Sequence, residues 1–192
     1  MPPVPEGTTP LDPDEAADLI PDHLMTTADL NDWEATNIVH AQEWALGRKH
    51  PDVATEHFVK SLHLRMFDET WTWAGKYRVS EKSIGSSPQL IAPQVRDACA
   101  NAAFWVKQRI FEPTELAVRF HHRMVAVHPF PNGNGRHARL LADALLYSLG
   151  VDLLTWGSQG LQATGEVRRT YIDALRSADN GDLSGLMRLA RA

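Results

Sequence analysis

Apolar residues recur along most of this chain at the spacing of one helix face, with charged and polar residues between them. Between residues 30 and 46 the repeat includes Leu30, Trp33 and Ala41, and it follows a hydroxyl- and acid-containing start, Thr26 to Asp29, typical of a helix N-terminus. The same periodicity predicts helices beginning at about residues 55, 93, 113, 135 and 165, and a shorter one after residue 182. The helix at about 135–149 is apolar on most faces, so we expect it to be the buried central helix.

Residues 71–88 interrupt this helical pattern. Aromatic residues and glycine alternate with polar ones from Trp71 to Ser80, and a stretch rich in Gly and Ser follows, up to Pro88. Two short extended arms around a Gly/Ser turn are typical of a β-hairpin. The predicted class is therefore mostly α with one hairpin.

Composition narrows the function classes. The chain has 192 residues, 43% of them hydrophobic, which is enough for one domain with a modest extension. Its single cysteine, Cys99, excludes an internal disulfide framework and any cysteine-based zinc site within one chain. No segment approaches the roughly 18 apolar residues of a membrane span, and the N-terminus has no leader pattern. We therefore expect a cytoplasmic protein that does not enter a membrane.

Charge is distributed unevenly around a net value of −5. Residues 1–47 hold ten acidic residues and no Lys or Arg, which favours a solvated acidic arm. The alternatives are that this segment lies near a basic anion-binding centre or offers a partner-binding face. The rest of the chain is weakly positive and has no basic stripe with interleaved aromatics, so direct nucleic-acid binding is not expected.

The chemistry is concentrated in residues 128–139. A glycine-containing turn, Asn132 to Gly135, leads into a helix N-terminus, where unpaired N–H groups and the helix dipole favour an anion. Arg136 and Arg139 are three residues apart and share one helix face, and guanidinium groups suit phosphate oxygens. His128 ends the preceding helix, because the residue before a proline disfavours helix, and is placed to take a proton from a hydroxyl.

Two alternatives remain at this point. A Gly-x-Gly turn between helices is often a plain connector, although the joint presence of a histidine and two in-phase arginines argues against that interpretation here. A histidine at a helix C-terminus is also favoured as imidazolium, which opposes its use as a base. Arg136, Arg139 or a metal ion would act in the opposite direction.

The run from His128 to Arg139 resembles the signature of the Fic (Fido) family, His-x-Phe-x-(Asp/Glu)-Gly-Asn-Gly-Arg-x-x-Arg. The matching residues are His128, Phe130, Gly133, Asn134, Gly135, Arg136 and Arg139. The string from Trp73 to Arg78 also resembles the start of the family's flap. This resemblance covers about residues 50–192 and implies a Fic/Fido helical bundle with one β-hairpin flap. We accordingly divide the chain into an acidic N-terminal arm and helix, 1–50, and a Fic (Fido) domain, 51–192.

The resemblance implies transfer of AMP from ATP, with Mg²⁺, to a hydroxyl side chain of a target protein. It makes His128 the catalytic base and Phe130 the residue that anchors the loop in the core. The phosphates would be held by Gly133, Asn134, Gly135, Arg136 and Arg139. The flap residues Val79, Ser80, Ile84 and Gly85 would bind the target as an added strand.

Two departures from the family pattern are visible. Asn132 occupies the acidic position that coordinates the metal, and a neutral amide lacks the charge that favours hard cations, so metal affinity should fall. The inhibitory string (Ser/Thr)-x-x-x-Glu-(Gly/Asn) is absent. Either an inhibitory partner protein supplies that glutamate, or the N-terminal helix supplies it from around Glu34 or Glu43.

These departures leave other functions open. One is transfer from another phosphate-bearing donor, and another is a degenerate Fic fold that serves as a regulatory or toxin–antitoxin-like binding module. At the N-terminus, residues 9–13 and 28–31 resemble the subgroup called mobile mystery protein B.

Overall fold

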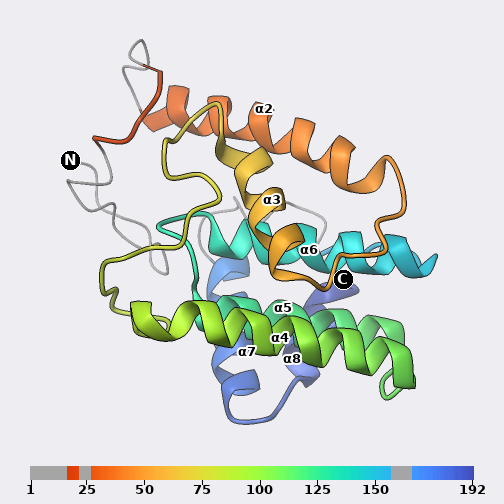
Figure 1. The fold of residues 1–192 in the computed structure, drawn as a ribbon. Coiled ribbons are helices and arrows are strands. Elements are labelled where there is room, and N and C mark those ends of the chain that lie inside the picture. Colours follow the sequence, from red (N-terminus) through yellow and green to blue (C-terminus); the bar gives the residue numbers. More distant parts are fainter. Residues whose placement is uncertain (1–16, 22–26, 157–165) are drawn as a thin grey trace.

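The computed structural model describes residues 17–21, 27–156 and 166–192, which form seven helices (Figure 1). They are α2 (Thr27–Leu46), α3 (Glu56–Phe67), α4 (Pro88–Gln108), α5 (Pro113–Val127), α6 (Asn134–Leu149), α7 (Glu166–Asp179) and α8 (Ser184–Ala190). The mostly helical class is confirmed. None of these helices, within the described ranges, is long and apolar enough to span a bilayer.

Local sequence explains where several helices begin and end. Thr55 caps α3, because its hydroxyl oxygen accepts a hydrogen bond from the backbone N–H of Phe58 at 3.1 Å. Pro113 lies in the first turn of α5, where a missing N–H costs nothing. Gly150 ends α6 with φ +73°, a left-handed conformation that glycine adopts without strain.

Helix α4 begins earlier than the sequence indicates. We predicted its start after Pro93, but the helix begins at Pro88 and continues through Pro93. Pro88 occupies the first turn, where proline fits, whereas Pro93 interrupts the backbone hydrogen bonding one turn later. The restriction that a proline places on the residue before it is a preference that packing can override; here Ile91 is fully buried.

The predicted β-hairpin is wrong. Residues 76–87, all of them described, contain no strand and run as an irregular loop between α3 and α4 (Figure 1). The backbone N–H groups of the two arms bond to residues 127 and 129, at and just beyond the end of α5, and not to the backbone of the opposite arm. The N–H of Arg78 donates to the Pro129 carbonyl (3.0 Å), and that of Ser86 donates to the Val127 carbonyl (3.1 Å). We call residues 78–86 the flap loop.

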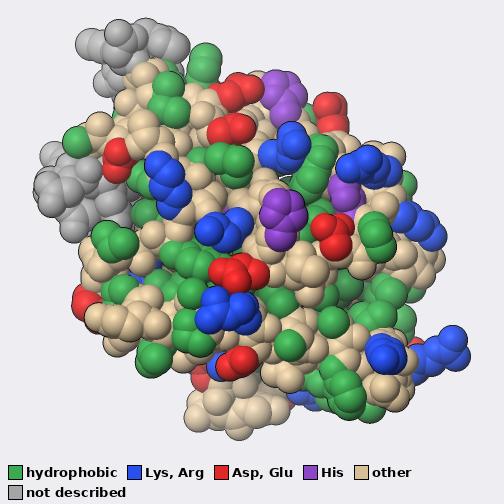
Figure 2. Space-filling view, in the orientation of Figure 1, with side chains coloured by type: hydrophobic (Ala, Val, Ile, Leu, Met, Phe, Trp, Pro, Cys, Tyr) green, Lys and Arg blue, Asp and Glu red, His purple; other side chains and the backbone are tan. Residues whose placement is uncertain are grey.

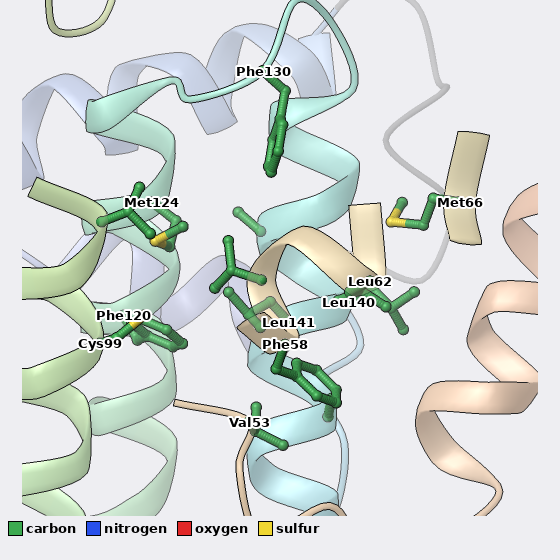
Figure 3. Packing of buried hydrophobic residues seen from close by; sticks show 14 of the residues in the cluster. Val53, Phe58, Leu62, Met66, Cys99, Phe120, Met124, Phe130, Leu140 and Leu141 are labelled. Carbon is green, nitrogen blue, oxygen red and sulfur yellow. The ribbon is translucent and has the colours of Figure 1, made fainter. Parts of the chain in front are cut away.

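Helix α6 lies between two hydrophobic clusters, as its apolar faces indicate. In Figure 1, α2 and α3 lie on one side of it and α4 and α5 on the other. Leu140, Leu141 and Ala144 belong to the larger cluster, shown in Figure 3, whereas Ala142 and Leu146 pack with residues of α5, α7 and α8. Because α6 is held on several sides, its N-terminal turn has a fixed position.

The surface is mixed in charge. Figure 2 shows Lys and Arg side chains interspersed with Asp and Glu over the face drawn, with hydrophobic side chains between them. The candidate catalytic and phosphate-binding residues lie in and just after the connection between α5 and α6.

Candidate active site

The connection between α5 and α6 begins and ends in left-handed backbone. His128 follows α5 with φ +52°, and its N–H donates to the Met124 carbonyl at 3.2 Å. Gly133 precedes α6 with φ +74°. A residue with a Cβ atom adopts this conformation at a cost, so surrounding contacts must hold His128 in place.

Gly133 is required by packing. A Cβ atom at this position would lie 2.3 Å from Cζ of Phe67, so the turn passes directly against a core ring. Gly135 differs, because it has no positive φ and an added Cβ would be 3.9 Å from the Tyr171 hydroxyl oxygen. Of the two glycines in the turn, only Gly133 therefore has a conformation that requires glycine.

Asn134 closes the turn from within. Its side-chain Oδ1 accepts from the Phe130 N–H at 2.9 Å, and its Nδ2 donates to the Phe130 carbonyl at 2.8 Å. We expected Asn134 at the phosphates, but its buried side chain is fully engaged with the backbone of the loop. Any contact from Asn134 to an anion would have to come from its backbone N–H.

Phe130 points from the connection into the core (Figure 3). Its ring is fully buried and stacks on the imidazole of His63, with ring centroids 3.6 Å apart. The Nδ1 atom of His63 accepts from the Gly75 N–H (3.0 Å), so Nε2 carries the proton and donates to the Asn132 carbonyl (3.1 Å). His63 thereby links α3 and the segment before the flap loop to the turn that contains Asn132.

His128 is only 8% exposed, and its pKa is lowered to about 4. Burial is the main cause, followed by the positive charges of Arg78 and Lys82 in the flap loop. The imidazole is therefore neutral near pH 7 despite its position at a helix C-terminus. The cations responsible come from the flap loop, not from Arg136 and Arg139 as we expected.

Arg136 is engaged by a carboxylate from α2. Its Nη1 atom lies 2.6 Å from Oε2 of Glu34, and its guanidinium also lies over the ring of Phe67. Glu34 is 4% exposed, and its Oε1 accepts from the indole N–H of Trp71 at 2.7 Å. The first arginine of the signature thus has an internal anion as its partner.

Arg139 has the tyrosine Tyr171 as its main partner instead. It lies at the ring of Tyr171 on α7, and burial lowers its pKa. The Tyr171 hydroxyl also bonds Nε2 of the fully buried His121 at 3.0 Å. One turn further along α6, burial raises the pKa of Asp143 to about 6, and the charges of Asp143 and Arg139 act on each other.

The residues around Asn132 do not fit a dedicated Mg²⁺ site. Its Oδ1 accepts from the Gly133 N–H at 2.7 Å, and Glu34 is already bonded to Arg136 and Trp71. Among the described residues, no group of three or more His, Cys, Asp or Glu side chains could hold a metal ion. Mg²⁺ prefers one or two carboxylates beside substrate phosphates, and this connection offers none that is unengaged.

The flap residues differ from one another in exposure. Val79 is 91% exposed and Ile84 is about half exposed, so both present apolar side chains to solvent. Gly85 instead packs against the site, because a Cβ atom there would lie 2.5 Å from Cβ of His128. The carbonyl of Ser80 accepts from the Arg78 guanidinium at 2.9 Å.

Sequence reasoning missed three residues at this site. Arg78 had one signal, its place in the string that resembles the start of the flap, but that string assigned it no role. His63 and Tyr171 had none, because each occupies an ordinary helical position. Only the fold brings them to the connection between α5 and α6.

Comparisons with known proteins agree with this geometry. The family model described as Fic/DOC family matches residues 53–146. The chain is 27% identical over 147 residues to protein adenylyltransferase fic-1 of Caenorhabditis briggsae, covering 74% of this chain and 27% of that protein. It is 26% identical over 157 residues to a probable protein adenylyltransferase of Aquifex aeolicus, covering 77% of this chain and 45% of that protein. The chain thus spans less than half the length of either relative.

A solved structure has the same fold. The BepC protein of Bartonella tribocorum, a VirB-translocated effector with bound AMPPNP, superposes with a TM-score of 0.69 at 15% identity, covering 86% of each chain. At this identity the likeness concerns the fold alone. The subgroup suggested by residues 9–13 and 28–31 stays a prediction, and residues 9–13 lie outside the described ranges.

Proposed function

Residues 53–146 of this chain form a domain of the Fic/DOC family, and from this premise we propose that the protein is an adenylyltransferase that moves AMP from ATP to a hydroxyl side chain of a target protein. The relatives of this chain named as protein adenylyltransferases support the proposal. The division at residue 50 remains part of the proposal, since the family match begins at residue 53.

The observation that carries the proposal is the pairing of a neutral His128 with the N-terminal turn of α6. A general base must be unprotonated at working pH, and the lowered pKa of His128 meets that condition. The first N–H groups of α6 have no partner within the helix, and they favour an anion together with the helix dipole. Base and anion site are joined by the short connection from His128 to Gly133.

The reaction follows from these groups. The imidazole of His128 accepts the proton of the target hydroxyl, and the hydroxyl oxygen attacks the α-phosphorus of ATP. The bond from the α-phosphorus to the oxygen bridging it to the β-phosphorus breaks, pyrophosphate leaves, and AMP remains esterified to the target. The N–H groups at the start of α6 and the guanidinium of Arg139 stabilise the phosphate oxygens.

Glu34 takes the role of the inhibitory glutamate, for which this chain has no string of the family pattern. Its carboxylate holds Arg136 at 2.6 Å, so a phosphate and Glu34 compete for the same guanidinium. This arrangement favours inhibition from within the chain over a requirement for an inhibitory partner protein. ATP must displace or share this contact before Arg136 contributes to phosphate binding.

Asn132 favours a second candidate function, nucleotide binding without efficient transfer. Its amide oxygen is bonded to the Gly133 N–H, and the described residues hold no group of three or more His, Cys, Asp or Glu side chains that could bind a metal ion. A domain that binds nucleotide and does little chemistry would act as a regulatory module. Transfer from a different phosphate-bearing donor is the third outcome that the experiment separates.

The test is mass spectrometry of lysate proteins after incubation with the protein, ATP and Mg²⁺. We expect AMP adducts on Ser, Thr or Tyr with wild-type protein and with His122→Ala, whose surface histidine pairs with Asp179 at 2.8 Å. The His128→Ala variant should lose at least about a hundredfold in labelling. Phosphate adducts would indicate another transfer, and nucleotide binding without any adduct would favour the regulatory module.

A further inference from the structure

Three consecutive carbonyl groups around His128 are all bonded by the flap loop. The Val127 carbonyl accepts from the Ser86 N–H at 3.1 Å, and the Pro129 carbonyl accepts from the Arg78 N–H at 3.0 Å. Between them, the carbonyl of His128 accepts from Nε of Arg78 at 2.8 Å.

These bonds answer a need that the backbone of His128 creates. With φ +52°, His128 leaves the helical path, so its carbonyl cannot join the hydrogen bonds of α5 and, being buried, requires a donor. A left-handed histidine also has to be held against its own conformational preference. Nε of Arg78 supplies that donor directly at the residue proposed as base.

The guanidinium of Arg78 joins this carbonyl to both arms of the flap loop. The side chain is 3% exposed, its Nη1 donates to the Ser80 carbonyl at 2.9 Å, and its Nη2 donates to the Ser86 carbonyl. A planar fork with five N–H donors can bond three carbonyls at once, which lysine cannot do from a fixed geometry. Close packing of these groups also requires glycine at position 85. A Cβ atom on Gly85 would lie 2.9 Å from Arg78 Nη2 and 2.5 Å from His128 Cβ.

We propose that Arg78 is a positioning residue for His128, holding the backbone of the base and the flap loop together as one unit. The proposal rests on the function proposed above. The flap loop then has a second role besides any contact with a target, because its hydrogen bonds to the carbonyls of residues 127–129 support His128.

Electrostatics provides a readout that separates positioning from mere structural support. The charged groups that act on His128 are Arg78 and Lys82 of the flap loop. The arginines of α6 are engaged elsewhere, Arg136 with Glu34 and Arg139 with Tyr171. Loss of the Arg78 charge should therefore raise the pKa of His128 above about 4, while burial still holds it below the ordinary value of 6.5. A lysine at this position should leave the pKa low.

The experiment compares Arg78→Gln, Arg78→Lys and the control Arg119→Gln in the full chain. Arg119 lies on α5, the helix that His128 follows, but its guanidinium pairs with Glu115 at 2.7 Å. Two quantities are measured: the pKa of His128 by NMR of its imidazole, and kcat and KM for ATP in AMP transfer. NMR needs no activity, so failure of the proposed function and failure of this proposal remain distinguishable.

We expect Arg78→Gln to raise the pKa of His128 and to lower kcat about a hundredfold, with KM for ATP changed by less than about threefold. Arg78→Lys should lower kcat with little change in the pKa, and Arg119→Gln should leave both unchanged. If Arg78→Gln does not fold, the kcat of Arg78→Lys decides. Wild-type kcat in a folded Arg78→Lys or Arg78→Gln variant, or an unmoved pKa in Arg78→Gln, would overturn the proposal.

Discussion

Different parts of the chain hold the two ends of the connection between α5 and α6. At its start, His128 is fixed through backbone carbonyls by the flap loop, and neighbouring cations keep it neutral. At its end, Arg136 and Arg139 are fixed through their side chains, one by the carboxylate of Glu34 on α2 and the other by Tyr171 on α7. The base therefore depends on a loop that faces solvent, whereas the phosphate-binding arginines depend on two helices remote from each other in sequence.

The flap-loop side thus determines whether His128 is ready to accept a proton, whereas the arginine side determines how readily phosphate binds. A base held neutral is ready without further change. An arginine paired with a carboxylate is not, since its partner must be exchanged for a phosphate. Substitutions on the two sides should accordingly alter different quantities.

The largest effect is expected between the two sides, at Gly133. Gly133→Ala forces a left-handed alanine and places Cβ 2.3 Å from the ring of Phe67, so it should cost about 3 kcal/mol or more in the free energy of unfolding. Gly135→Ala is the matched control, because its Cβ would meet only ordinary contacts; it should leave stability within about 1 kcal/mol of wild type. Chemical denaturation measures both, and equal losses would show that the turn is not constrained by Phe67.

The arginine side should respond next, through Glu34→Gln. The amide keeps an oxygen for the Trp71 indole but no longer neutralises Arg136, so ATP affinity should rise about tenfold. Stability should fall by about 2 kcal/mol, because a partly buried ion pair has lost one charge. Calorimetric titration with ATP checks the affinity, with the exposed Glu43→Gln on the same helix as control. Unchanged affinity would mean that the ion pair serves stability alone.

The smallest effect is expected for Tyr171→Phe. The change removes a hydroxyl bonded to His121 at 3.0 Å and lying at Arg139, and a single neutral hydrogen bond contributes about 1 kcal/mol. ATP affinity should fall about twofold to threefold, as Arg139 keeps its charge and its place on α6. A loss of tenfold or more in the same titration would indicate that the Tyr171 hydroxyl itself contacts the nucleotide.

The sequence predicts the helices of this fold well, for local reasons. Pro113 and Gly150 mark helix ends by their backbone chemistry alone, and the apolar repeat of α6 identifies it as the buried helix. The flap loop was mistaken for a hairpin because a sequence rich in aromatic residues and glycine is compatible with a hairpin and with an irregular loop. Its conformation is determined by hydrogen bonds to residues 127–129. The sequence offered Glu34 and Glu43 as candidates for an inhibitory glutamate, but it did not indicate the partner. Glu34 and Arg136 are 102 positions apart, and neither segment alone predicts their ion pair.

The site shows the same division between local and distant information. The motif places His128, Arg136 and Arg139 at one connection, yet the state of each is set by residues outside it. Burial, Arg78 and Lys82 decide the protonation of His128. The cytoplasmic location and the subgroup stay predictions from the sequence.

The central claim, that His128 is a base kept neutral by its surroundings, is tested most directly by the rate of AMP transfer at pH 5.5 and pH 7.5. With a pKa of about 4, His128 is unprotonated at both values, so the two rates should agree within about twofold. Circular dichroism at pH 5.5 verifies that the protein remains folded. A rate about tenfold lower at pH 5.5, as a histidine with the ordinary pKa of 6.5 would give, would contradict the account.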